Sequence, residues 1–355
     1  MILGHFYCLI DISRNEEPMK QIPFKHILLV ASVLVGHSLS AIEREVRIQS
    51  HRGDFELAGT LAFPPDGNAK AVIVTATGSG LQDRDETVFG HRPFKVISDA
   101  LVENGYAVLR MDDRGFGESG GDGKSASLSD FADDVESGLR YVETFFQSPK
   151  GVLGHSLGGA IAPILASEGK ADFIITLGGP AWQGDSIVMS QARKLAVDAT
   201  GKWEGEQRQR ELLAVVKERM PDFIARPILF EILSRDLGQG AAIPEVRHQL
   251  NVAIDGLLSP SYREMLRFDP ADVIKKTNVP WLALYGEKDI QVLPGNLQTL
   301  KELNKDIDTY LLQKHNHLFQ DNSTGSLQEY ETLGQAPSEE CIRIIVDWLE
   351  KKFNN

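Results

Sequence analysis

Cysteine is scarce in this sequence, with Cys8 and Cys341 near opposite ends of the chain. Neither the cysteines nor the nine histidines have the spacing of a zinc site. We therefore expect no zinc site. If residues 1–41 are removed, Cys341 has no cysteine partner, so an internal disulfide is excluded and cysteine usage does not indicate a compartment.

Basic residues are also few, because 37 lysines and arginines stand against 50 acidic residues and the net charge is −13. No basic stripe occurs anywhere in the chain. This balance excludes a general affinity for nucleic acid or for an anionic membrane surface. The hydrophobic content of 42% is that of a globular protein with a full core.

Long hydrophobic runs are absent apart from residues 27–36, which are apolar or small and follow Lys20 and Lys25. A positive start, a short apolar run and small residues after it are typical of a secretory signal peptide. The run is about half the length that a bilayer-spanning helix needs, so no stable membrane span is expected.

The leader therefore predicts an exported protein, periplasmic or secreted, with a signal peptide at about 19–41. Met19 is a natural start for such a signal, and residues 1–18 are then an upstream extension. The alternative is that the leader stays uncleaved and anchors the protein to a membrane.

Hydrophobic periodicity predicts an α/β fold in residues 42–355. Two β-rich runs at 43–50 and 55–63 indicate an antiparallel hairpin. Strands then alternate with helices, which is typical of a mostly parallel sheet covered on both faces. The later strands are expected at 71–76, 106–111, 151–153, 173–177, 281–285 and 309–312.

The alternation stops between about 181 and 269. This segment is polar and shows helical periodicity without strand periodicity. Since strands return after it, we interpret it as a helical cap inserted between two strands of a single domain.

The strongest motif is G-H-S-L-G-G, at positions 154–159, between a short apolar strand and a helix. This has the G-x-S-x-G form of a strained strand-to-helix turn that exposes a serine hydroxyl. Ser156 is therefore the predicted nucleophile. A serine hydroxyl needs a base that is itself oriented by an acid.

In chain order the acid and the base should follow the serine, each in a loop after a strand. Asp289 and Glu287 follow the strand before last, and we favour Asp289. His315 and His317 follow the last strand, and spacing alone does not choose between them.

Three segments carry a resemblance to a known family: G-S-G-L-Q-D-R-D at 78–85, D-D-R-G at 112–115 and N-H-L-F-Q at 316–320. With them, the chain from about residue 42 onward resembles the α/β-hydrolase superfamily and, within it, a branch of bacterial esterase-like hydrolases. The resemblance implies a mostly parallel eight-stranded sheet flanked by helices, with a cap. It also implies that His317 is the base. The chain departs from that branch at Leu81, where proline is frequent.

Two backbone N–H groups should bind the oxyanion. One is that of Leu157, directly after the nucleophile. The other is expected from the loop after the third strand, where we choose Ser79, with Gly80 as an alternative. Gly80 and Trp182 are further candidates for the substrate pocket.

Other polar residues have weaker signals. The charge run at 83–86 indicates a solvated or ion-paired loop, or one that orients the oxyanion loop. Asp112, Asp113 and Arg114 are expected to hold loops by ion pairs. Three histidines are assigned structural roles: His91, His155 and His248.

These residues predict a serine hydrolase that cleaves small-molecule carboxylic esters through an acyl-enzyme. No metal or organic cofactor is implied, because Ser156, Asp289 and His317 supply the nucleophile, the base and the electrostatics. A thioesterase or a peptidase would use the same residues. From a different class, a non-catalytic binding module is the remote alternative, although such modules usually lose a catalytic residue.

Overall fold

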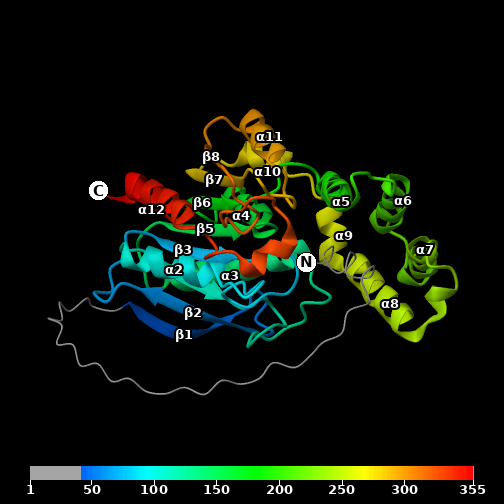
Figure 1. Cartoon of the computed structure of the whole chain (residues 1–355). Helices are drawn as coiled ribbons and strands as arrows, with labels where there is room; N and C mark the ends of the chain where they lie inside the picture. Colours follow the sequence, from blue (N-terminus) through cyan, green and yellow to red (C-terminus); the bar gives the residue numbers. More distant parts are fainter. Residues whose placement is uncertain (1–40, 355) are drawn as a thin grey trace, which may run out of the picture.

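The computed structural model of the protein describes residues 41–354, so the predicted leader lies outside the described residues apart from Ala41. The described chain contains one eight-stranded sheet in the order β1-β2-β4-β3-β5-β6-β7-β8 (Figure 1). The strands are β1 (Ile42–Gln49), β2 (Glu56–Phe63), β3 (Val72–Ala76), β4 (Ala107–Met111), β5 (Lys150–His155), β6 (Phe173–Leu177), β7 (Trp281–Gly286) and β8 (Asp308–Leu312).

The first two strands pair antiparallel, as does β2 with β4, and every other pairing is parallel. The predicted mostly parallel sheet of eight strands is confirmed. A parallel strand buried on both faces needs apolar residues on both faces. In β3, Val72 and Val74 belong to one hydrophobic cluster, whereas Ile73 belongs to the cluster on the opposite face.

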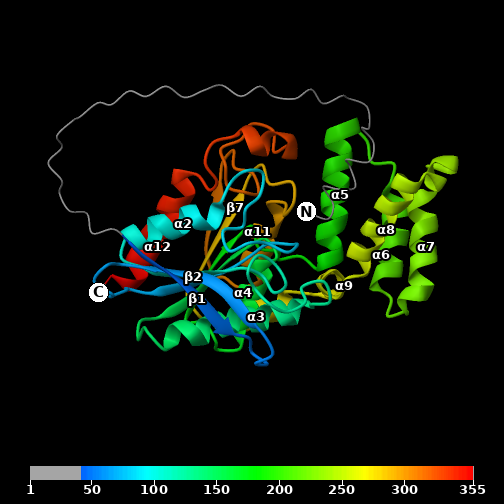
Figure 2. The ribbon, with the colours of Figure 1, turned by 90° about the horizontal axis from the view of Figure 1, so that it is seen from below.

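Helices cover both faces of the sheet (Figures 1 and 2). One face packs against α2 (Pro93–Glu103) and α12 (Glu339–Phe353). The other packs against α3 (Leu128–Glu143), α4 (Gly158–Ser167), α10 (Ala271–Lys276) and α11 (Gly295–Leu303). A short 3₁₀ helix, η3 (Leu327–Thr332), follows β8.

Between β6 and β7 the chain leaves the sheet and forms a separate helical layer, on the right of Figure 1. This layer has its own hydrophobic cluster, which includes Leu213, Leu229 and Leu266. We refer to it as the cap. Its helices are α5 (Gly184–Thr200), α6 (Glu206–Lys217), α7 (Asp222–Ser234), η2 (Gly238–Ala242), α8 (Pro244–Leu258) and α9 (Pro260–Arg267).

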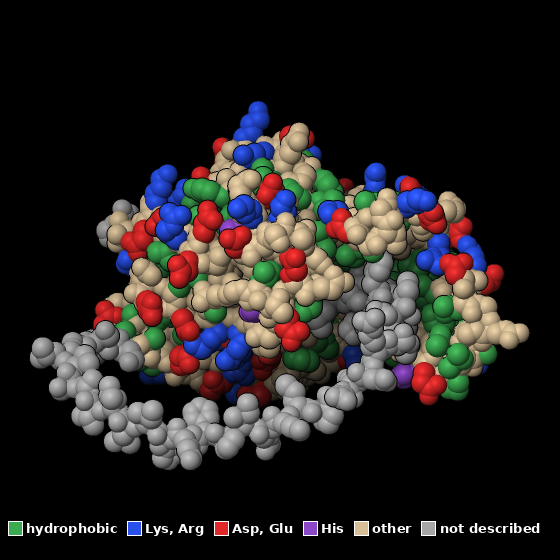
Figure 3. Space-filling view, viewed as in Figure 1, with side chains coloured by type: hydrophobic (Ala, Val, Ile, Leu, Met, Phe, Trp, Pro, Cys, Tyr) green, Lys and Arg blue, Asp and Glu red, His purple; other side chains and the backbone are tan. Residues whose placement is uncertain are grey.

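The surface is charged and mixed. On the face seen in Figure 3, acidic and basic side chains are interspersed over the sheet-and-helix body and over the cap. Within residues 41–354, no helix combines the length and apolar character needed to cross a bilayer.

Because the central strands are parallel, the loops after β3, β5, β7 and β8 meet at one edge of the sheet. The candidate catalytic and oxyanion residues lie in these loops.

Candidate active site

Ser156 lies in the turn between β5 and α4 with a φ of 53°. A non-glycine residue seldom adopts this left-handed conformation, and its presence here marks a strained turn. The turn also packs closely against β3, because a Cβ at Gly158 would lie 2.0 Å from the carbonyl oxygen of Ala76. Glycine at this position therefore lets the turn form, and the turn presents the Ser156 hydroxyl above the sheet.

Asp289 and His317 come together from the loops after β7 and β8. The Nδ1 of His317 donates to Oδ2 of Asp289 at 2.7 Å, and both side chains are buried. The other carboxylate oxygen accepts the backbone N–H groups of Gln291 and Val292, at 2.7 and 2.9 Å. With Nδ1 committed to Asp289, the Nε2 of His317 is the nitrogen that can accept a proton.

Ser156 and His317 line the same cavity. Within the described chain, the Ser156 hydroxyl makes no hydrogen bond to His317 or to another residue. Catalytic hydrogen bonds of this kind often tighten only in the enzyme–substrate complex. The three side chains thus share one site, and the Asp289–His317 bond is already formed.

The loop after β3 lies against the nucleophile. A Cβ at Gly78 would be 3.4 Å from the Cβ of Ser156 and 2.9 Å from a carboxylate oxygen of Glu86. The Gly78 N–H donates to that oxygen at 2.7 Å. In contrast, the N–H groups of Ser79 and Leu157 donate to no other residue in the described chain, so both are available to an oxyanion.

Asp113 accepts hydrogen bonds from both ends of the loop after β3. Its carboxylate accepts the Thr77 hydroxyl at 2.7 Å and the Gln82 N–H at 2.8 Å. Asp113 therefore holds this loop by hydrogen bonds, whereas an ion pair was expected. Burial raises the pKa of the Asp113 carboxyl to about 7, and the nearby Glu86 and Asp134 carboxylates add to the shift.

This raised pKa predicts how Asp113→Asn changes stability with pH. An unfolded aspartate ionises near pH 4, so the stability from protonated Asp113 is lost as pH rises from about 4 to about 7. Asparagine does not ionise and can still pair with Thr77 and Gln82. Because Asp113 also borders a second cavity, we expect less than the full change in stability that this pKa shift implies.

The measured quantity is the Tm of D113N minus the Tm of the wild type at the same pH. We expect this difference to increase by about 3–5 °C between about pH 5 and about pH 8. Thermal unfolding followed by circular dichroism measures this difference. Asp66→Asn, at an exposed turn, is the control for losing one charge. A D113N difference that is constant with pH would contradict the prediction.

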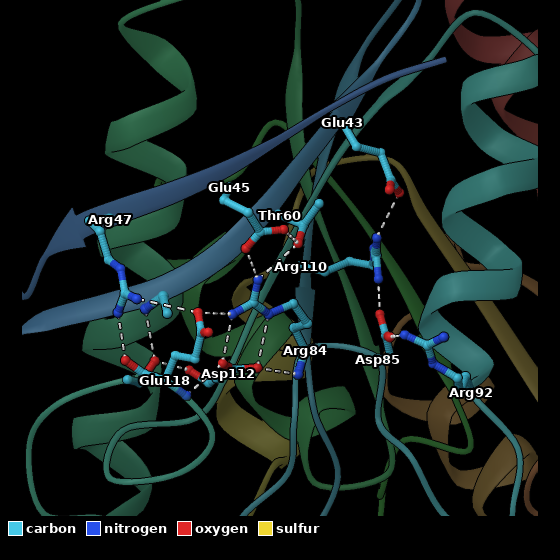
Figure 4. Close-up of polar contacts among 12 residues, drawn as sticks. Glu43, Glu45, Arg47, Thr60, Arg84, Asp85, Arg92, Arg110, Asp112 and Glu118 are labelled. Atoms are coloured by element: carbon cyan, nitrogen blue, oxygen red, sulfur yellow. Dashed lines mark hydrogen bonds and ion pairs between the residues drawn. The ribbon is translucent and has the colours of Figure 1, made fainter. Parts of the chain in front are cut away.

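Within the charge run at 83–86, Arg84 and Asp85 are ion-paired, as Figure 4 shows. The Arg84 guanidinium donates to both carboxylate oxygens of Asp112, at 3.0 and 2.8 Å, and also pairs with Glu45. Asp85 pairs with Arg110 and Arg92. The loop is thereby attached to β1 and β4 and to the start of α2.

Sequence reasoning missed one pair at the site, Glu86 with His155. The His155 Nδ1 lies 2.9 Å from a Glu86 carboxylate oxygen, and its Nε2 lies 3.0 Å from the His317 carbonyl oxygen. The sequence offered only the positions of the two residues as signals, because Glu86 ends the charge run and His155 precedes the nucleophile.

The two rival candidates have other partners. His315 contacts the Gln313 carbonyl and the Ser338 hydroxyl, both at 2.7 Å. Glu287 accepts the Lys314 N–H at 3.1 Å. Thus the imidazole against Asp289 is that of His317.

The cavity at Ser156 has a volume of about 160 Å³ and lies between the loops and the cap. Trp182 lines it, whereas Gly80 lines the neighbouring cavity of about 430 Å³. Glu86 is the only carboxylate lining the first cavity in the described chain, and no lysine or arginine lines it.

No metal-binding group was found in the part of the chain that the structure describes: no three or more His, Cys, Asp or Glu side chains have a suitable arrangement. The Cys341 side chain is buried in α12 and does not line the cavity at Ser156. Burial raises the pKa of its thiol, so the thiol stays protonated at neutral pH.

Comparison with known proteins gives one family match and one sequence relative. The family described as serine aminopeptidase, S33 matches residues 92–317, more than half of the chain. Esterase EstD of Thermotoga maritima is 25% identical over 269 residues, which cover 74% of this chain. The chain spans 58% of that esterase's length.

Solved structures share the fold at low identity. An esterase of Pyrococcus furiosus has a TM-score of 0.55 and 15% identity, covering 91% of this chain and 96% of its own. A thermophilic esterase from Thermogutta terrifontis has a TM-score of 0.52 and 20% identity, covering 87% and 99%. Proline iminopeptidase from Mycobacterium smegmatis has a TM-score of 0.54 and 16% identity, covering 87% and 98%.

The sheet order, the strained serine turn and the family match agree with one another. The resemblance to the α/β-hydrolase superfamily is thereby confirmed. The chain belongs to the α/β-hydrolase family described as serine aminopeptidase, S33.

Proposed function

We propose that this protein is a serine hydrolase that cleaves carboxylic esters through an acyl-enzyme on Ser156. The observation that carries the proposal is the 2.7 Å bond between Asp289 and His317 in the cavity that Ser156 lines. An imidazole oriented by a buried carboxylate, in the same cavity as a serine hydroxyl, is the arrangement that activates the hydroxyl for attack.

In the proposed reaction, His317 Nε2 takes the proton of Ser156 as its Oγ bonds to the ester carbonyl carbon. The N–H groups of Leu157 and Ser79 bind the oxyanion, and Asp289 stabilises the imidazolium. When the bond to the alcohol breaks, His317 protonates the leaving oxygen. It then deprotonates a water, which attacks the acyl-enzyme, and the proton returns to Ser156 as the acid leaves.

The cavity supports a neutral, apolar substrate. The cap and the loops contribute apolar side chains to it, including Phe89, Ile187, Val188, Leu195, Met265 and Phe268. A small apolar cavity favours a short hydrocarbon group over a long or charged one. The esterases among the relatives and solved structures are consistent with this choice.

The family description and the similar proline iminopeptidase favour a peptidase as the second candidate. An aminopeptidase has to bind the substrate's terminal ammonium group, and an accessible carboxylate is the usual partner. In the cavity the Glu86 side chain is 2% exposed and pairs with His155. We therefore favour esters over aminoacyl amides.

A substrate panel tests this preference. We expect kcat/KM to be highest for short-chain (about C2–C6) aryl esters and lower for longer acyl chains, because the cavity is small and apolar. Hydrolysis of p-nitrophenyl esters, acyl thioesters and aminoacyl anilides is compared under one set of conditions. Faster turnover of the amides would favour the peptidase.

A further inference from the structure

Glu86 and His155 form a buried pair directly behind the candidate triad. Their side chains are 2% and 8% exposed. Besides the Glu86 carboxylate, His155 contacts the main-chain carbonyl of His317. The proposed mechanism assigns no step to either residue.

The partners of His155 determine its charge. Both ring nitrogens face oxygens that accept hydrogen bonds: a Glu86 carboxylate oxygen at 2.9 Å and the His317 carbonyl at 3.0 Å. Both nitrogens donate only when the imidazole carries two protons. The same Glu86 oxygen also accepts the Gly78 N–H, which suits an ionised carboxylate.

The pKa of His155 agrees with this assignment. Burial by itself lowers it, but the Glu86 carboxylate and the two hydrogen bonds outweigh burial, and the net shift is upward. A buried cation is tolerated where a carboxylate compensates it.

The pair connects three segments of the site. Glu86 holds the Gly78 N–H, one residue before the predicted oxyanion donor Ser79. His155 holds the carbonyl of His317, and its ring lies 4.7 Å from the His317 ring between centroids. His155 also directly precedes Ser156 in the chain.

The main chain at Glu86 is held in an unusual conformation, with a φ of 55°. The ion pairs of Arg84 and Asp85 in Figure 4 attach the preceding residues to the sheet. Such a φ persists only where the surroundings determine it, and here the result is that the carboxylate points at Gly78 and His155.

On the basis of the function proposed above, we propose that Glu86 and His155 are positioning residues. As a charged pair they fix two loops relative to Ser156. One is the oxyanion loop after β3, which carries Ser79, and the other is the base loop after β8, which carries His317. Their effect is then on the transition state and not on the binding of the substrate.

The single variants Glu86→Gln and His155→Gln test the proposal, since each removes one charge at similar size. We expect kcat for a short aryl ester to fall by about 10–100-fold, with KM changed less than about threefold. Rates are expressed per active site, counted by fluorophosphonate labelling carried to completion. A purely structural role would lower the Tm and leave this kcat unchanged.

The double variant E86Q/H155Q tests whether the two residues act as a pair. Each single variant leaves the other charge buried without its partner, whereas two neutral amides can hydrogen-bond to each other. We therefore expect the double variant to lose less activity than the product of the two single losses. It also tests the kcat effect if a single variant does not fold.

Two matched controls lie outside the site. Glu136→Gln removes a buried carboxylate of α3 that pairs with Lys170 at 2.6 Å. His248→Gln removes an exposed histidine of α8, in the cap. Both should keep kcat within about twofold of wild type.

The outcomes separate this inference from the proposed function. If the wild type hydrolyses esters but the folded E86Q and H155Q variants keep its kcat, the positioning role is wrong and the esterase stands. Single losses that multiply in the double variant overturn the pairing. If the wild type neither hydrolyses esters nor reacts with fluorophosphonate, the proposed function fails, and this inference fails with it.

Discussion

Replacing Ser156 by alanine is expected to lower kcat for aryl esters by roughly 10⁴–10⁶-fold and to abolish fluorophosphonate labelling. The variant keeps His317, Asp289 and the two oxyanion donors but has no atom that can form the acyl-enzyme. Serine and alanine have the same difficulty with a φ of 53°, so the Tm should stay within about 2 °C of wild type. Ester hydrolysis, labelling and thermal unfolding measure the three effects.

Ser167 offers the matched control, because it lies at the end of α4, the helix that follows the nucleophile. Its hydroxyl donates to the carbonyl of Ile164 at 2.9 Å, and Ser167 does not line the cavity at Ser156. Ser167→Ala should therefore keep both activity and labelling. If the folded wild type neither hydrolyses esters nor reacts with fluorophosphonate, the esterase proposal is wrong and the non-catalytic binding module is favoured.

Replacing Asp289 by asparagine is expected to lower kcat by about 10⁴-fold. The carboxylate oxygen that accepts the Gln291 and Val292 N–H groups must remain an oxygen, so the amide nitrogen faces His317. The nitrogen would donate to Nδ1 and move the imidazole proton to Nε2. In that tautomer Nε2 cannot accept the proton of Ser156.

Glu287→Gln is the comparison that separates the two acids, since Glu287 follows the same strand but accepts the Lys314 N–H. We expect its kcat to stay within about threefold of wild type. Steady-state kinetics over a range of pH measure both variants. A large loss in E287Q with a small loss in D289N would identify Glu287 as the acid instead.

Several elements could be predicted because their signals are local. The apolar run of β3 and the G-x-S-x-G turn at Ser156 depend on neighbours within a few residues of the chain. The position of Asp289 after a strand followed from the same kind of pattern. Gly80 shows the limit, because as a pocket candidate it lines the neighbouring cavity and not the cavity of Ser156.

The charge run shows why other roles were not predictable. Arg84 pairs with Asp112, 28 residues away, and Glu86 pairs with His155, 69 residues away. A run of acidic and basic residues in a loop is equally compatible with solvent exposure. Only the packing of α2 and its loop against the sheet buries Asp85 and Glu86 and selects their partners.

By itself, the sequence determined the α/β alternation, the helical segment between β6 and β7 and the serine on its turn. These features follow from periodicity and from backbone sterics, which act over short distances along the chain. Spacing did not choose between His315 and His317, and the resemblance implied His317, whose imidazole faces Asp289 in the structure. Only the tertiary structure decided that a second, buried histidine pairs with Glu86 behind it. Those contacts join loops that are distant in sequence. A buried charged group destabilises the fold unless an opposite charge compensates it, so burial selects the partner.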